Sequence, residues 1–478
     1  MSYQKFTKDV GLIGLTDLLI GLKTLIILPI MTKMLDAENY GIWAQMIVTI
    51  NLVAPIATLG LPFALVRFLA AEKEKEEIQE GIYSVLTAIF IVGLIISLIL
   101  IIFSYPISNF FGCGQNLIKI LAFVILLECL NLVFLNIFRA FQEIKKYSFF
   151  IIFLTVGEVG LIAAAVSLGH RLLGAILSLL IIRLATFLIV GALIIKKVGI
   201  KFPNFSRIKD YLSFGLPIVP SNISSWVVQS SDRYLIGYFL GAVFVGYYAP
   251  GYTLGCIVSL FVAPLGFVLP VVLSKFYDEN KMDKVKTYFE YSLKYFLMFA
   301  IPSAFGLSIL SKQLLTILST PEIASQGYLV TPFVVLSILL YGTYAIISQI
   351  IVLVKKTKII GTIWIIAAIT NFGLNLIFIP KIGILGAAIT TLLAYFLAFL
   401  LTWHYSFQNF KFDIGWKFIL KSLSASIVMS LFIIRFSPVG ILEVSIAIII
   451  SVLLYSIVLF LLKGFTRNEL KFFVKLFK

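Results

Sequence analysis

Seven of the charged residues inside long apolar stretches of this chain are candidates for binding or coupling chemistry. They are Lys23, Glu128, Glu158, Arg183, Asp232, Arg233 and Lys294. A charge at the middle of a bilayer costs about 2.5–3.5 kcal/mol on insertion scales, so such residues usually face a water-filled cavity or an ionic partner. Buried cations could bind an anionic group, and carboxylates shielded from water could take up a proton or Na⁺.

Four of these residues are predicted to lie at a similar depth. Counted from the ends of their apolar stretches, Lys23, Glu128, Glu158 and Arg183 fall near the middle of the bilayer. In one interpretation, Lys23 and Arg183 attract an anionic substrate into a cavity, while Glu128 and Glu158 are candidates for ion coupling. In the other, the charges form structural ion pairs, for example between Glu158 and Arg183 on consecutive antiparallel helices.

The remaining charges are predicted nearer the ends of their apolar stretches. Arg233 and Lys294 complete the set of candidate anion-binding cations, and Asp232 is a third candidate for ion coupling. Asp232 and Arg233 could instead pair within one helical turn or extend to the outer surface. Asn371 and Asn375, one turn apart, could line the same cavity or form hydrogen bonds between helices.

The composition identifies the environment of these residues. The chain has 478 residues, of which 61% are hydrophobic and 13% charged, with a mean hydropathy of +1.08. Typical soluble domains have roughly 45–50% apolar and ~25% charged residues, so a soluble globular enzyme is excluded. The apolar runs are continuous over ~20 residues, as in membrane-spanning helices, and do not alternate as barrel strands do. We therefore predict an all-α polytopic membrane protein.

The hydropathy pattern predicts about 14 transmembrane helices. If the amino terminus is cytoplasmic, alternate loops on the inner side carry 27 lysines and arginines, against 5 in the outer loops. Basic residues are retained on the cytoplasmic side, so both termini are predicted to be cytoplasmic, in a cell (plasma or inner) membrane. The net charge of +16 then reflects topology and favours anionic lipids; it requires no nucleic-acid partner.

An internal repeat suggests two lobes. Leu35, Ala37 and Gly41 recur 205 positions later as Leu240, Ala242 and Gly246. The predicted spans 40–69 and 242–273, at matching positions, each carry two prolines. Such paired interruptions are typical of the moving helices of transporters, but they could equally be structurally neutral kinks, because membrane helices tolerate proline. We predict six-helix lobes at 1–200 and 201–410, two additional helices at 411–463, and an amphipathic cytoplasmic tail at 464–478.

Motifs for bound cofactors are missing from the sequence. No phosphate-binding loop of the type GxxxxGK(S/T) occurs, and the three cysteines and two histidines have no metal-site spacing. No predicted loop is long enough to form a separate extramembrane domain. We therefore expect neither a cofactor nor a metal, apart from coupling to H⁺ or Na⁺, and no enzymatic activity.

Several segments resemble a known family. They are Leu216-Pro217 with Pro220 and Trp226, Ser231-Asp232-Arg233-Tyr234 with Ile236-Gly237, Val245-Gly246-Tyr247-Tyr248, Tyr40-Gly41 with Trp43, and Gly383 to Ala388. Together with the span count, these segments resemble the polysaccharide-biosynthesis flippases (Wzx-type) of the multidrug/oligosaccharidyl-lipid/polysaccharide (MOP) exporter superfamily. Only Asp232 and Arg233 are candidate site residues that match the family's motif.

The resemblance implies a MATE-like, V-shaped transporter with alternating access. Such proteins move oligosaccharides linked to polyprenyl (pyro)phosphate from the inner to the outer leaflet for cell-surface glycan assembly. The expected partners are therefore the lipid-linked oligosaccharide, membrane lipids and other glycan-assembly membrane proteins. One alternative is a cation-coupled multidrug antiporter of the same superfamily, which should carry an excess of carboxylates in its cavity. Another is a glycan polymerase or ligase, which would need a sizeable external loop with catalytic groups.

Overall fold

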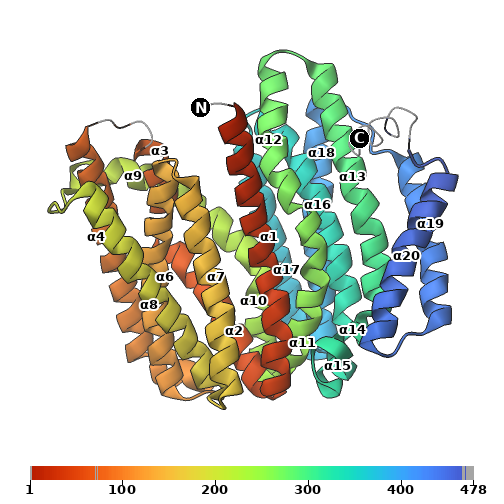
Figure 1. Cartoon of the computed structure of the whole chain (residues 1–478), viewed down its shortest axis with the longest axis horizontal. Helices are drawn as coiled ribbons and strands as arrows, with labels where there is room; N and C mark the ends of the chain where they lie inside the picture. Colours follow the sequence, from red (N-terminus) through yellow and green to blue (C-terminus); the bar gives the residue numbers. More distant parts are fainter. Residues whose placement is uncertain (1–2, 70–71, 73, 466–468, 470–478) are drawn as a thin grey trace. The chain divides into compact units, whose positions relative to one another are not determined.

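The structure is a computed structural model in which residues 3–69, 72, 74–465 and 469 are described (Figure 1). Side chains are described for these residues except 3–10 and 267. Helices account for the regular structure throughout this part of the chain, as the composition predicts. Exposed leucine, isoleucine and phenylalanine side chains cover long stretches of many helices, as expected for surfaces that face lipid.

The α-helices are defined as follows: α1 (Tyr3–Met34), α2 (Ala37–Ala57), α3 (Leu61–Leu69), α4 (Lys75–Ile102), α5 (Ser104–Phe111), α6 (Gln115–Ala140), α7 (Ile144–Ser167), α8 (Arg171–Val198), α9 (Ile208–Gly215), α10 (Val219–Leu240), α11 (Ala242–Gly255), α12 (Ala263–Asp278), α13 (Met282–Ile309), α14 (Ser311–Leu318), α15 (Pro321–Gly327), α16 (Val330–Leu353), α17 (Thr357–Ile382), α18 (Ile384–Asn409), α19 (Trp416–Phe436) and α20 (Ile441–Leu461). Three short 3₁₀ segments, Phe205–Arg207, Leu216–Ile218 and Cys256–Phe261, join some of them.

Within the described residues, 13 helices are long and apolar enough to cross a membrane. The predicted span 211–239 corresponds to α9, a 3₁₀ turn and α10, which is less apolar than the others because it carries several serines and the Asp232–Arg233 pair. The prediction of an all-helical, multi-pass membrane protein with about 14 spans is confirmed.

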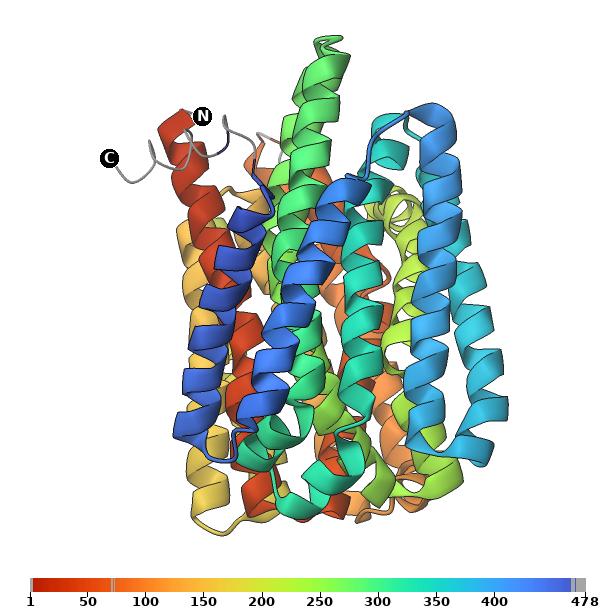
Figure 2. The same ribbon diagram turned by 90° about the vertical axis from the view of Figure 1, so that its right-hand side faces the viewer.

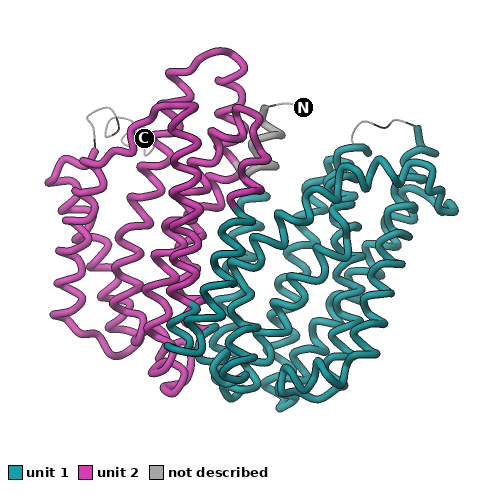
Figure 3. Tube along the Cα trace, turned by 180° about the vertical axis from the view of Figure 1, so that it is seen from behind, with its two compact units in different colours: residues 1–249, 364–387 teal, residues 250–363, 388–478 magenta. Residues whose placement is uncertain are grey.

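Contacts divide the chain into two compact units (Figure 3). Unit 1 contains residues 1–249 and 364–387, and unit 2 contains residues 250–363 and 388–478. In unit 1, α7 packs between α1 and α8, while α6 packs against α2, α4 and α8. In unit 2, α13 packs against α16 and α19, and α19 and α20 form the antiparallel hairpin visible in Figure 2. The lobe boundaries at residues 200 and 410 describe a repeat and stay a prediction. The predicted tail helix at 464–478 falls largely outside the described residues.

The two proline-bearing spans are both interrupted. The first breaks between α2 and α3, where Leu59 and Gly60 have φ angles of 52° and 70°. The second breaks between α11 and α12, where residues Cys256–Phe261 form a 3₁₀ helix and Pro264 follows in the first turn of α12. Shifted by the 205 positions of the repeat, Leu59 and Gly60 correspond to Pro264 and Leu265 at the start of α12, so the two interruptions lie near each other in the repeat without coinciding.

The repeated glycines also pack against each other's segment. A Cβ atom on Gly41 would overlap the backbone carbonyl of Ala242, and a Cβ atom on Gly246 would overlap the carbonyl of Ala37. The contact is reciprocal, because Gly41 and Gly246, like Ala37 and Ala242, are 205 residues apart. Only glycine permits this approach of the two helix starts. This contact holds the amino-terminal ends of α2 and α11 together within unit 1.

Candidate functional site: a charge network and a polar cavity

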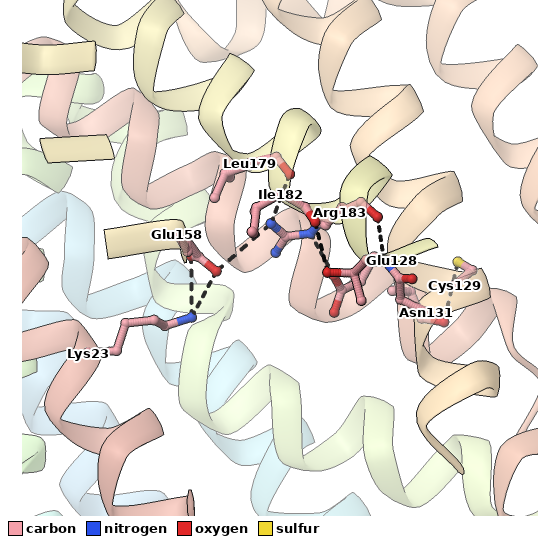
Figure 4. Close-up of polar contacts among 10 residues, drawn as sticks. Lys23, Glu128, Cys129, Asn131, Glu158, Leu179, Ile182 and Arg183 are labelled. Atoms are coloured by element: carbon pink, nitrogen blue, oxygen red, sulfur yellow. Dashed lines mark hydrogen bonds and ion pairs between the residues drawn. The ribbon is translucent and has the colours of Figure 1, made fainter. Parts of the chain in front are cut away.

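Four long helices of unit 1 bring charged side chains together near their middles (Figure 4). Lys23 lies on α1, Glu128 on α6, Glu158 on α7 and Arg183 on α8. These helices are neighbours, because α7 contacts α1 and α8, and α8 contacts α6. The four residues predicted at similar depth therefore form one network.

Each cation of the network contacts a carboxylate. Lys23 Nζ lies 3.2 Å from Glu158 Oε2, and Arg183 Nε lies 2.6 Å from Glu128 Oε2. Arg183 also links the two pairs, since its Nη1 atom lies 3.9 Å from Glu158 Oε2. The predicted pairing of Glu158 with Arg183 is thus present, but it is the longest of the three contacts.

The network is unevenly accessible. The side chains of Glu158 and Arg183 are 7% and 9% exposed, whereas those of Lys23 and Glu128 are 24% and 27% exposed. Asn131 Nδ2 donates a hydrogen bond to the Arg183 carbonyl oxygen at 2.9 Å, which ties α6 to α8 beside the arginine. With two cations and two carboxylates, the formal charge sums to zero, which limits the cost of placing four charges in apolar helices.

The family-matched pair on α10 forms a separate, buried group. Asp232 accepts hydrogen bonds from the backbone N–H of Arg233 at 2.8 Å, from its guanidinium at 3.0 Å and from the hydroxyl of Tyr248. Arg233 also donates to the Gln229 carbonyl at 2.9 Å and lies over the Tyr248 ring. Of the two structural arrangements predicted, the pair adopts the one in which the charges satisfy each other within the helical turn.

Lys294 contacts the carboxy-terminal segment of unit 2. Its Nζ atom lies 2.7 and 2.8 Å from the carboxylate oxygens of Glu469, and Tyr295 Oη lies 3.3 Å from the same group. The sequence reasoning missed Glu469 as a partner, because 175 residues separate it from Lys294 and no hydropathy signal marks it. Both Asn371 and Asn375 are fully buried, and Asn375 donates to Asn371 Oδ1 at 3.2 Å.

Unit 1 also contains a cavity of about 450 Å³ whose lining mixes polar and apolar side chains. Its walls come from α2, α3, α6 and α10, and its lining is free of charged side chains. Its polar lining groups include Asn51, Asn136, Asn222, Ser225, Trp226 and Gln229. Trp226 belongs to one of the family-like segments, whereas the amides were not predicted as site residues, because single amides in apolar helices carry no signal comparable to that of a charge. Two cavities of about 380 and 470 Å³ in unit 2 have mostly apolar linings.

No group of three or more histidine, cysteine, aspartate or glutamate side chains suited to a metal ion occurs among the residues that the structure describes. The three cysteines are free thiols. Burial raises the pKa of Cys113, in the loop between α5 and α6, to about 11, so this thiol stays protonated at neutral pH.

Comparison with known proteins identifies the family. The model of the family described as polysaccharide biosynthesis protein matches residues 6–276, and the MatE family model matches residues 217–377. The chain is 24% identical over 453 residues to the "Probable low-salt glycan biosynthesis flippase Agl15" of Haloferax volcanii, a match that covers 92% of this chain and 93% of the relative.

Solved structures have the same fold. A structure of the lipid II flippase MurJ, in an inward closed conformation, superposes with a TM-score of 0.76 at 21% identity, covering 93% of this chain and 98% of the other. An inward-facing multidrug resistance MATE family transporter of the MOP superfamily superposes with a TM-score of 0.69 at 17% identity, covering 81% and 94%. Since the first family model matches more than half of the sequence, the chain belongs to the polysaccharide biosynthesis protein family, as the sequence resemblance predicts.

Proposed function

We propose that this protein is a flippase that moves oligosaccharides linked to polyprenyl (pyro)phosphate from the inner to the outer leaflet by alternating access. The observation that carries the proposal is the network of Lys23, Glu128, Glu158 and Arg183 at the middle of four helices. A phosphate-bearing headgroup needs cations within the membrane, and these helices supply two. The names of the relatives Agl15 and MurJ support the same class of substrate.

The network also suggests how transport is coupled to an ion. An anionic headgroup that binds Arg183 or Lys23 competes with Glu128 and Glu158 for the same cations. When a carboxylate loses its cationic partner within the membrane, taking up H⁺ or Na⁺ removes the cost of the uncompensated charge. In this proposal Glu128 and Glu158 are the ion-coupling groups, while Asp232, held by Arg233 and Tyr248, is a weaker candidate.

The proposal includes the orientation in the membrane and the biological context. Both termini face the cytoplasm of a cell (plasma or inner) membrane, because that orientation places most basic loops inside. The substrate is bound in its inner-leaflet form and released on the outer side, where other glycan-assembly membrane proteins would use it.

A cation-coupled multidrug antiporter is the alternative, supported by the match of the MatE model to residues 217–377 and by the MATE-like fold. An antiporter for organic cations requires an excess of negative charge in its binding region. The network of unit 1 has no such excess, since each carboxylate contacts a cation. The flippase is therefore favoured.

The test is transbilayer movement of a fluorescent polyprenyl diphosphate oligosaccharide in proteoliposomes. We expect movement with the wild-type protein and at least a tenfold loss with the double variant Arg183→Ala/Glu128→Gln, which removes the cation and its partner together. Lys119→Ala, which removes an exposed cation from α6, is the matched control and should move lipid normally. Movement retained by the double variant would exclude Arg183 from the mechanism. No movement of any glycan-lipid, with ion-driven export of cationic dyes instead, would favour the antiporter.

A further inference from the structure

The cavity of unit 1 has the chemistry of a binding site for a neutral sugar. Its volume of about 450 Å³ lies within the range of small-molecule sites, roughly 300–1,000 Å³. The lining combines amide and hydroxyl groups, one indole ring and several apolar side chains, among them Leu52, Ile56 and Phe63, and it has no charged side chain. Phosphates call for cations, which this lining lacks, whereas sugar hydroxyls call for groups that both donate and accept hydrogen bonds.

Three of the four amides of the cavity are available to a ligand, whereas Asn136 donates to the Leu132 carbonyl at 2.7 Å and accepts from Arg139 at 3.1 Å. Within the described part of the chain, the side chains of Asn51, Asn222 and Gln229 have no hydrogen-bond partner, although each lines the cavity. Asn222 and Gln229 are half-buried on α10, two turns apart, and Asn51 comes from α2. A carboxamide provides two donors and an acceptor, which suits the paired hydroxyl groups of a sugar ring.

The indole side chain in the cavity is held in a defined orientation. Trp226 Nε1 donates a hydrogen bond to the Val48 carbonyl at 3.0 Å, and the indole ring packs against Tyr234 with centroids 5.6 Å apart. Tyr234 is itself fixed by a hydrogen bond to Thr49 at 2.5 Å. A ring whose polar edge is already satisfied offers an apolar face, and the C–H-rich face of a hexose stacks on such a surface.

The cavity adjoins the charge network along one helix. Glu128 of the network and Leu132 and Asn136 of the cavity follow each other at four-residue intervals on α6. They therefore lie on successive turns along the same side of this helix. A ligand with phosphate at Arg183 and sugar near Asn136 would therefore extend along α6. The eight residues from Glu128 to Asn136 correspond to a rise of about 12 Å, so the ligand would have to extend over this length.

We propose that this cavity, lined by Asn51, Asn136, Asn222, Trp226 and Gln229, binds an uncharged sugar ring of the transported lipid, while the charge network binds its phosphate. The inference rests on the proposed function and adds to it a site and a ligand class, a neutral saccharide. It assigns recognition of the glycan to the available amides of α2 and α10, Asn51, Asn222 and Gln229. These residues would therefore discriminate between a glycosylated lipid and its bare carrier.

The test compares two lipids with one set of variants. The probes are a polyprenyl diphosphate carrying a disaccharide of N-acetylglucosamine and the same diphosphate without sugar, each titrated against full-length protein in nanodiscs. For Asn222→Ala/Gln229→Ala we expect affinity for the glycosylated lipid to fall about tenfold, as for two lost hydrogen bonds, with affinity for the bare lipid unchanged. Gln115→Ala/Asn116→Ala, which removes exposed amides at the start of α6, is the matched control and should alter neither affinity.

The outcomes separate this inference from the proposed function. If the wild-type protein binds and moves both lipids but the cavity variant weakens neither or both equally, the sugar site is wrong and the flippase proposal stands. If the wild-type protein binds neither lipid, the proposed function fails and the sugar site fails with it. Selective loss of the glycosylated lipid, with thermal stability equal to that of the control variant, supports the site.

Discussion

The ion pair between Arg183 and Glu128 offers a quantitative test of the network. Arg183→Met removes the guanidinium but keeps a long apolar side chain in its place. Glu158 would retain Lys23 at 3.2 Å, whereas Glu128 would lose the one cation it contacts in the described part of the chain. Removing one partner of a buried pair typically costs about 3–5 kcal/mol. Because Glu128 is 27% exposed and Glu158 keeps a partner, we expect about 3 kcal/mol.

The double variant separates the ion pair from the packing of the arginine. Glu128→Gln alone leaves Arg183 with Glu158 at 3.9 Å, and we expect it to cost about 1–2 kcal/mol, as for one lost charge-assisted hydrogen bond. In Arg183→Met/Glu128→Gln no uncompensated charge remains at this position, so the double variant should be about 2 kcal/mol more stable than the sum of the single losses. That difference is the coupling energy of a double-mutant cycle, which for contacting residues is typically about 0.5–3 kcal/mol.

The assay is reversible unfolding of the purified protein in mixed micelles, with all four proteins of the cycle measured together. Glu143 and Lys197 provide the comparison, since their side chains are 2.7 Å apart but 26% and 38% exposed. An exposed pair of this kind should give a coupling energy of at most about 1 kcal/mol. If the losses at Arg183 and Glu128 simply add, within about 0.5 kcal/mol, the reasoning about the network is refuted.

Three further predictions concern other parts of the molecule. Gly246→Ala places a Cβ atom against the Ala37 carbonyl and should lower the free energy of unfolding by roughly 1–3 kcal/mol. Gly160→Ala is the control, since its Cβ atom would have no neighbour within 4 Å, and it should be neutral or stabilising. Equal shifts of the melting temperature in the two variants would contradict the glycine contact. Burial works to raise the pKa of Glu143, but hydrogen bonds from Lys197 and Lys146 outweigh it and hold that pKa below its usual range. Its stabilising effect should therefore be present above the unfolded-state pKa of about 4.3 and vanish as the pH falls through the lower folded-state pKa, so the wild-type protein and Glu143→Gln should differ by at most about 1 kcal/mol at pH 7 and converge in acid. Lys294→Met should increase the rate of backbone hydrogen exchange at Phe465 and Glu469, whereas Lys294→Arg should leave that rate unchanged. Unchanged exchange in Lys294→Met would show that Lys294 does not hold the segment around Glu469 in place.

The depth of each charged residue in the membrane could be predicted from the sequence, because this depth depends on the position of the residue along its helix. A helix rises by a constant amount per residue, so residues at the middles of adjacent spans meet at one level. This reasoning placed Lys23, Glu128, Glu158 and Arg183 together, and the structure confirms that they form a network. The paired prolines marked the two spans that are interrupted, but not the positions of the breaks, because Pro55 and Pro270 lie inside α2 and α12.

The choice of partner could not be predicted, because it depends on how each helix is rotated and which helices are neighbours. Depth alone allows Arg183 to pair with Glu158 as well as with Glu128. The structure places α8 against both α6 and α7, and the closer contact is the 2.6 Å contact to Glu128. The repeat likewise predicted where Gly41 and Gly246 lie in their segments, but gave no indication that these segments touch each other.

The ion pairs of Arg183 with Glu128 and Glu158 change how a substrate anion could bind to this arginine. Isolated cations in a cavity would attract any anion, and their insertion into the membrane would be costly. With Arg183 held by Glu128 and linked to Glu158, a phosphate group must replace an internal carboxylate before it gains the guanidinium. Because one anion replaces another at the guanidinium, this exchange gives the phosphate little net binding free energy. In the proposed function, selectivity for a complete lipid-linked glycan therefore has to come from groups outside the ion pairs, and we propose the uncharged amides of the neighbouring cavity for this role.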